Sequence, residues 1–187
     1  MIDYKKMRED HRPRNIKLLF LAESPPVPRD GHEPFFYNEA DMPSYGLFQA
    51  MMKACLPDQW LAVKEDLLDL FENDKGFYLI DASDMPLQKS VKYRELKAIG
   101  KAGTVVNTIK NLAEEGSFAN NKIKLVIIGV KMHGIFYDYL LRERSIPTSR
   151  GPFDRVILNK NPLPFPNNSA ASDEFVRELN KIVRDME

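Results

Sequence analysis

The sequence predicts an α/β fold, a three-layer sandwich in which helices cover both faces of a central four-stranded parallel sheet. Two observations lead to this prediction. The chain contains four short runs of apolar residues. Segments with the apolar spacing of a buried helix face lie between and after these runs. A continuous apolar run is typical of a strand covered on both faces, and strands that alternate with helices are typical of a parallel sheet.

The first half of the chain supplies two of these strands and one helix. The apolar run Lys17–Ala22 predicts a strand, because a Glu-Ser-Pro-Pro sequence stops it abruptly. Between positions 47 and 56 apolar residues recur at the spacing of a buried helix face. Residues 77–80, Phe-Tyr-Leu-Ile, predict the second strand.

The second half continues the alternation. Apolar spacing predicts helices over 105–112 and 132–140, and the apolar runs 125–128 and 156–158 predict the remaining strands. The last helix is predicted to begin at Ser172, a good N-cap residue that two acidic residues follow in the first turn.

Composition indicates one globular domain. The 187 residues are 43% hydrophobic and 29% charged, and the 27 basic side chains balance the 27 acidic ones. This balance gives no argument for constitutive binding to nucleic acid or to an anionic membrane, so only a local basic patch would serve. We expect residues 1–15 to be a flexible or loosely docked arm and residues 16–187 to form a single, monomeric domain.

Cysteine and histidine usage argues against a metal or disulfide framework. Cys55 stands alone, and the three histidines lack the close pairing of a zinc motif. We therefore expect no metal and no cofactor. No apolar run reaches membrane-spanning length and the first residues are charged, so a cytoplasmic location is the expectation.

Right-handed crossovers would bring the loops that follow the strands to one edge of the sheet. These loops begin at Glu23, Asp81, Gly129 and Asn159. Ligands of parallel α/β folds bind at this edge. The loops over 23–44 and 159–171 are long and stiffened by proline, which favours a functional role for both.

The first of these loops is similar to a known motif. Glu23, Ser24 and Pro25 follow the first strand as an acidic residue, an alanine and a proline do in the motif Gly-Glu-Ala-Pro-Gly. Further along, Phe35 lies in a Pro-Phe pair. The family that carries this motif also has a Pro-Phe pair there, and its ring stacks on an extruded base.

Two later loops add to the similarity. Asp81 ends the second strand near the position of that family's base-reading asparagine, and Gly129 ends the third strand as a glycine often does there. Asn161-Pro162 corresponds to the second catalytic motif, which begins His-Pro or Asn-Pro. From Lys17 onward the chain thus resembles the uracil-DNA glycosylase superfamily, as a divergent member.

The departures from the family pattern concern the same loops. Pro26 replaces the motif glycine, Asp81 replaces the asparagine, and Leu163 replaces the serine of the second motif. The base that is recognised could therefore differ, or the chain could keep the fold and lack the chemistry.

The resemblance implies that Glu23 and Asn161 are catalytic. Cleavage of an N-glycosidic bond needs a carboxylate that orients water and stabilises the cationic sugar, the role of Glu23. It also needs donors aimed at the departing base, which the Asn161 amide would supply. The alternatives are a loop glutamate bonded to nearby backbone and a surface asparagine.

Ser24, Phe35 and Asp81 are the expected base-binding residues. Phe35 would stack on a flipped base, with Phe36 or Tyr37 as substitutes, although these rings could equally close a small core under the loop. An ionised Asp81 would favour a base with an exocyclic amine, since a carboxylate repels the carbonyls of uracil unless it is protonated. Its alternative is a turn aspartate.

DNA contacts are expected from Lys89, Lys92 and Lys160, which could neutralise phosphates, and from Leu163, which could act as an apolar wedge. A solvated surface and an inward-packed leucine are the alternatives. The resulting hypothesis is a DNA glycosylase acting on a damaged or unusual base of single- or double-stranded DNA. A catalytically silent binding module and a nucleoside or nucleotide hydrolase are the competing hypotheses.

Overall fold

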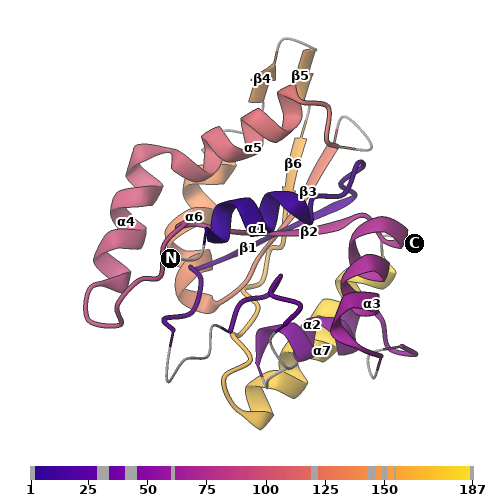
Figure 1. Ribbon diagram of the computed structural model, residues 1–187. Helices are drawn as coiled ribbons and strands as arrows, with labels where there is room; N and C mark the ends of the chain where they lie inside the picture. Colours follow the sequence, from indigo (N-terminus) through magenta and orange to yellow (C-terminus); the bar gives the residue numbers. More distant parts are fainter. Residues whose placement is uncertain are drawn as a thin grey trace.

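A four-stranded, all-parallel sheet forms the centre of the computed structural model, which describes residues 3–28, 34–40, 46–59, 62–118, 122–142, 146–148, 151–153 and 155–185. The strand order is β2-β1-β3-β6 (Figure 1). The strands are β1 (Leu18–Ala22), β2 (Phe77–Asp81), β3 (Lys122–Ile127) and β6 (Arg155–Leu158). The predicted α/β fold with four parallel strands is confirmed.

The central strand β1 explains why continuous apolar runs identified the sheet. All five of its residues are buried, and it pairs in parallel with both β2 and β3. Successive side chains of a strand point to opposite faces, so an entirely buried strand must be covered on both faces.

Helices surround this sheet on both sides. In Figure 1, α4 (Lys92–Ala102), α5 (Thr104–Glu114) and α6 (Val130–Arg142) lie together on one side. On the other side α2 (Leu47–Cys55) packs against α7 (Ser169–Arg184), beside α3 (Lys64–Asp69) and a short π-helix, η1 (Leu70–Asp74). With α1 (Tyr4–Asp10), the described residues form seven α-helices.

Two short strands outside the sheet were not predicted. β4 (Ile146–Thr148) and β5 (Gly151–Phe153) pair in antiparallel fashion. Each has a proline at its centre and neither has an alternating apolar pattern, so no strand signature is present in either segment.

The N-terminal segment differs from the expected flexible or loosely docked arm. Asp3 caps helix α1 by accepting a hydrogen bond from the Lys6 backbone N–H at 2.9 Å. Tyr4 and Arg8 are buried, and the Tyr4 ring contacts the Phe35 ring edge-on at 5.0 Å. Only Tyr4 and Arg8 of this short helix are buried, so the sequence shows no apolar periodicity that would predict the helix.

The N-cap of helix α7 lies four residues before the predicted N-cap, Ser172. This N-cap is Asn168, whose side chain accepts from the Ala171 backbone N–H at 2.9 Å, and Ser172 lies inside the helix. Asparagine and serine are comparable N-cap residues, so residue type alone does not favour Ser172 over Asn168. None of the helices in the described parts of the chain combines the length and apolar character needed to cross a bilayer.

Candidate functional site

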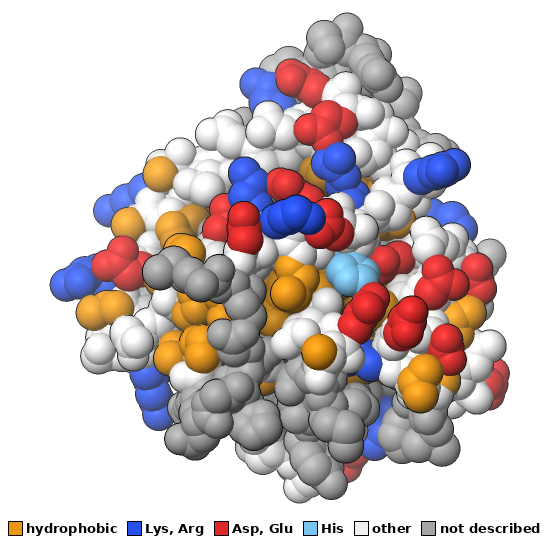
Figure 2. Space-filling view, in the orientation of Figure 1, with side chains coloured by type: hydrophobic (Ala, Val, Ile, Leu, Met, Phe, Trp, Pro, Cys, Tyr) orange, Lys and Arg blue, Asp and Glu red, His pale blue; other side chains and the backbone are white. Residues whose placement is uncertain are grey.

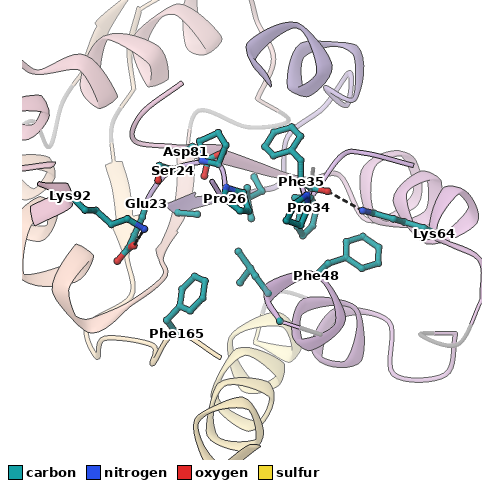
Figure 3. A pocket seen from close by; sticks show the side chains of 16 residues that line it. Glu23, Ser24, Pro26, Pro34, Phe35, Phe48, Lys64, Asp81, Lys92 and Phe165 are labelled. Atoms are coloured by element: carbon teal, nitrogen blue, oxygen red, sulfur yellow. Dashed lines mark hydrogen bonds and ion pairs between the residues drawn. The ribbon is translucent and has the colours of Figure 1, made fainter. Parts of the chain in front are cut away.

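A cavity of about 420 Å³ opens at the carboxyl ends of β1 and β2. Figure 3 shows Glu23 and Lys92 on one side of it, Phe35 and Lys64 on the opposite side, and Phe165 reaching in from a separate loop. Its polar lining residues are Glu23, Ser24, Lys64, Asp81 and Lys92, and its aromatic ones are Phe35, Phe36, Phe48 and Phe165.

Parallel pairing fixes the relative positions of the acidic residues. Ala22 of β1 lies opposite Asp81 of β2, so the residue after one strand end neighbours the other strand end. The pairing continues beyond the strands, because the Ala82 N–H donates to the Ala22 carbonyl at 2.9 Å and the Ser83 N–H donates to the Glu23 carbonyl at 3.3 Å. Glu23, Ser24 and Asp81 therefore share one rigid sheet edge.

Glu23 forms an ion pair within the cavity lining. The Lys92 ammonium, at the first residue of α4, donates to Glu23 Oε2 at 3.1 Å. The carboxylate side chain keeps 23% of its surface exposed, so it can meet both a bound molecule and water. Lys92, predicted as a phosphate contact, here lies against the candidate catalytic carboxylate.

Asp81 holds a buried oxygen that lacks a partner. Its Oδ2 atom is covered and accepts no hydrogen bond within the described chain, although part of the residue reaches the cavity. Burial raises the pKa of this carboxyl from 3.8 to about 7, because the positive charges of Arg8 and Lys92 only partly compensate the lost hydration. The group is therefore neutral in a large fraction of molecules near pH 7.

Ser24 contributes a second buried polar atom to the same lining. Its Oγ is covered and has no hydrogen-bond partner among the described residues. Buried polar groups are nearly always satisfied in folded proteins, by protein, water or ligand. Ser24 Oγ and Asp81 Oδ2 are thus two covered polar atoms without a partner among the described residues, and both belong to residues that line the cavity.

Phe35, Phe36 and Phe48, here called the aromatic wall, line the cavity and also belong to the hydrophobic core. Phe35 is 4% exposed and lines the cavity, while its backbone carbonyl accepts a hydrogen bond from the buried Lys64 ammonium at 3.0 Å. Its neighbour Phe36 also lines the cavity and packs edge-on against Phe48 of α2. Phe35 is therefore a ring of the core that also borders the cavity.

Tyr37 ties the long loop to the edge of the sheet. Its hydroxyl donates to the Leu79 carbonyl at 3.0 Å and accepts from the Leu79 N–H at 2.7 Å. β2 is an outer strand, so this one hydroxyl satisfies both outward-facing backbone groups of Leu79. The bond fixes Phe35 and Phe36 against the cavity.

Asn161 does not join these residues. It is exposed and absent from the cavity lining, and its backbone carbonyl accepts from the Asn159 side-chain amide at 2.9 Å. The strand before it, β6, is separated from β1 by β3. The described geometry gives Asn161 no contact with Glu23.

Leu163 requires a correction. It is 2% exposed, its carbonyl accepts from the Gly129 N–H at 2.9 Å, and it bridges to Ile128 at the end of β3. A buried leucine cannot reach a duplex, so the expected wedge role does not fit this position. Phe165, two residues later, is the exposed apolar side chain of that loop and lines the cavity.

The remaining predicted DNA contacts are surface residues. Lys89 and Lys160 are exposed, near the carboxyl ends of β2 and β6. Sequence reasoning did not place Lys64, Phe48 or Phe165 at the cavity. Lys64 begins a helix of six residues without an apolar repeat, so no periodic signal marked it. The described residues hold no group of three or more histidine, cysteine or acidic side chains arranged to bind a metal ion.

The fold and the cavity together define a parallel α/β protein with a small-molecule-sized site at the carboxyl edge of its sheet. Comparison with family models, curated proteins and solved structures found no match to this chain.

Proposed function

We propose that this protein is a DNA glycosylase-like hydrolase, of uracil-DNA glycosylase-like three-layer fold, that cleaves the N-glycosidic bond of a damaged or unusual base flipped into the cavity. The observation that carries the proposal is the convergence of Glu23, Ser24, Asp81 and Phe35 on one cavity at the carboxyl ends of β1 and β2. The resemblance to the uracil-DNA glycosylase superfamily implies a role for each of these four residues.

The cavity suits a planar ring. Its volume of about 420 Å³ lies within the range of small-molecule sites, and aromatic rings dominate one wall. A base that leaves the helical stack needs new stacking partners and hydrogen bonds to its edge. Phe35 and Phe36 supply the former, and Ser24 and Asp81 supply the latter.

The proposed reaction adds water to the sugar carbon as the bond between carbon and base nitrogen breaks. The bonding electrons leave with the base, which then takes up a proton. Glu23 orients the water, accepts its proton and stabilises the cationic sugar. Ser24, neutral Asp81 and the Lys92 ammonium are the donors that line the cavity and could stabilise the departing anion. Asn161 lies outside this set.

The test is replacement of Glu23 in a base-release assay. Purified protein is incubated with single- and double-stranded oligonucleotides that carry deaminated, oxidised or alkylated bases, and abasic-site formation is quantified. We expect Glu23→Gln to lower turnover by about 100-fold or more while oligonucleotide binding persists. Glu95→Gln, on the surface of α4, is the matched control and should leave turnover unchanged. Lack of release from every substrate would refute the proposal.

A nucleoside hydrolase is the second candidate, favoured by the charge of the surface. Figure 2 shows basic and acidic side chains side by side over α1, where Lys5 pairs with Glu9 and Lys6 with Asp10. This face offers no continuous basic path for a polymer. Faster turnover of free nucleosides than of oligonucleotides, under the same Glu23 dependence, would favour this candidate.

A further inference from the structure

We infer that His11 is a proton-dependent latch for helix α1. With its proton, the imidazole holds α1 on η1 and on residues 34–40. Without the proton, α1 undocks more often and uncovers the outer side of the loop that carries Phe35. The residues of the latch lie outside the proposed reaction, so the inference does not rest on the proposed function.

His11, the C-cap residue of α1, joins this helix to two other segments. Its Nδ1 atom lies 3.0 Å from Oε1 and 3.2 Å from Oε2 of Glu72, in η1. Its Nε2 atom lies 3.6 Å from Oε1 of Glu39, in the loop after β1. The ring also stacks on Tyr37 of that loop, with the ring centres 5.2 Å apart and the planes 19° apart. One side chain thus contacts both partners of the helix.

Helix α1 depends on such side-chain contacts because it is short. It has seven residues, and a helix of that length is not stable without packing. Tyr4 meets Phe35 edge-on with ring centres 5.0 Å apart. Arg8 donates to Asp84 Oδ1 at 2.8 Å, and its carbonyl accepts from the Tyr78 hydroxyl at 3.2 Å. Loss of the charge on His11 therefore weakens one of a small number of contacts that hold the helix.

Glu72 makes this contact sensitive to the charge of the imidazole. The residue is 6% exposed, and its Oε1 atom accepts no hydrogen bond within the described chain. Burial raises the pKa of its carboxyl, His11 lowers it, and the like charge of Asp69 raises it further. A buried carboxylate that loses its cationic partner is left with an uncompensated charge. Deprotonation of His11 creates that state beside α1.

The direction of the pH effect follows from the groups that face His11. Acidic side chains face it from all three segments: Glu72 from η1, Glu39 from the loop and Asp10 from α1. The hydrogen bond with Glu72 raises the pKa of His11 above its usual 6.5, against the opposing effect of burial. The stabilisation by the imidazolium is therefore complete below pH 6.5, while Glu72 is ionised, and is lost as pH rises through the raised value. Burial holds the pKa of Tyr37 well above 10, so this phenol stays neutral throughout.

The experiment measures amide hydrogen exchange by mass spectrometry from about pH 6 to about pH 9, with protection expressed relative to the intrinsic exchange rate at each pH. Protection of residues 3–12 should fall about tenfold over this range, the ratio expected for loss of a hydrogen bond between charged groups. Its midpoint should match the titration of the His11 ring followed by NMR. Residues 34–40 should keep their protection, because Tyr37 and Lys64 hold this loop independently of α1.

Two variants identify the titrating pair. His11→Gln keeps a polar side chain without a titrating proton, so residues 3–12 should exchange faster at pH 6 and lose the pH-dependent step. Glu72→Gln removes the buried charge and should also abolish the step. The matched control is His133→Gln on α6, where the ring contacts the Asn159 carbonyl, and it should keep the wild-type step.

Asp81 titrates in the same range and needs a separate control. Its ionised form attracts Arg8, so its titration would tighten the docking of α1 as pH rises, opposite to the effect expected from His11. Asp81→Asn should therefore keep the loss of protection in residues 3–12. Protection of these residues that is independent of pH, that increases above pH 7, or that still shows the step in His11→Gln would overturn the inference. An equal loss in residues 34–40 and in the sheet would also overturn it, because it would indicate general unfolding.

Discussion

A single carboxyl group shows how position in the sheet determines chemistry in this protein. Asp81 is the last residue of β2, directly beside the strand that carries Glu23. Its backbone pairs with Ala22 of β1, and its Oδ2 atom is covered. The protein therefore carries a buried acid whose hydration is lost and whose charge has no dedicated partner.

Asp81 should make the protein less stable as the pH rises. Burial raises the pKa of its carboxyl from 3.8 to about 7, so the folded state retains a proton that the unfolded chain has released. The stability supplied by this proton is complete below pH 3.8 and is lost as pH rises through about 7. Asp81→Asn should then stabilise the fold by about 2–4 kcal/mol at pH 8 and by much less near pH 4.

Urea denaturation across this pH range measures the effect. Asp185→Asn, at an exposed position after α7, is the matched control and should shift stability by only a few tenths of a kcal/mol at all pH values. Equal stabilisation of Asp81→Asn at pH 4 and pH 8 would contradict the role assigned to the buried proton.

Three of the site residues that sequence reasoning found lie at strand ends. Glu23, Ser24 and Asp81 directly follow or end buried apolar runs, so their meeting at one edge follows from parallel pairing alone. Asn161 and Leu163 lie in a proline-rich loop with several apolar residues, and the sequence does not tell which of these points inward. Leu163 packs into the core, and Phe165 lines the cavity instead.

At the scale of elements, the long loop after β1 owes its shape to contacts with the edge of the sheet. Tyr37 is 1% exposed, stacks with His11 at 5.2 Å and bonds to both backbone groups of Leu79. The Lys64 ammonium holds the carbonyl of Phe35 from the opposite side. These bonds, together with the prolines, make the aromatic wall a fixed surface.

Tyr37→Phe should destabilise the protein measurably. The change removes one hydroxyl and leaves the buried N–H and carbonyl of Leu79 without their partner, which costs about 2–4 kcal/mol. Thermal or urea unfolding measures the loss. Tyr93→Phe, at an exposed position on α4, is the control and should be nearly neutral. A Tyr37→Phe variant as stable as wild type would show that water replaces the hydroxyl.

Element prediction succeeded where burial leaves a pattern and failed where it does not. The four strands of the sheet and helices α2, α5, α6 and α7 were predicted from apolar runs or periodicity. Helix α4 was not predicted, because only Leu96 and Gly100 of its residues are buried and the helix therefore has no continuous apolar face. Helices α1 and α3 are only seven and six residues long, so periodicity has too few turns to be detected.

At the scale of the whole molecule, basic and acidic side chains are equal in number, but the basic ones differ in whether they have an acidic partner. Lys89, Lys131 and Lys160 follow the carboxyl ends of β2, β3 and β6, all are exposed, and none pairs with an acidic side chain within the described ranges. These three cations differ from Lys5 and Lys6 of α1, which pair with neighbouring carboxylates.

Replacing Lys89 and Lys160 by Ala together should weaken oligonucleotide binding regardless of its sequence. If both contact phosphates, the slope of log K against log salt should become shallower by about 1–2. Fluorescence anisotropy at several salt concentrations measures this slope. Lys5→Ala, on α1, is the control and should leave it unchanged. An unaltered slope in the double variant would place the nucleic acid elsewhere or favour a free nucleoside as substrate.

The hydroxyl of Tyr37 also has a consequence for self-association. An outer strand with free backbone groups is a template for pairing with a second chain, and such pairing starts aggregation. At Leu79 those groups are occupied by the same loop that forms the aromatic wall. Sequence changes that loosen this loop to admit a larger ligand would uncover the strand edge, so solubility limits how far the site can be remodelled.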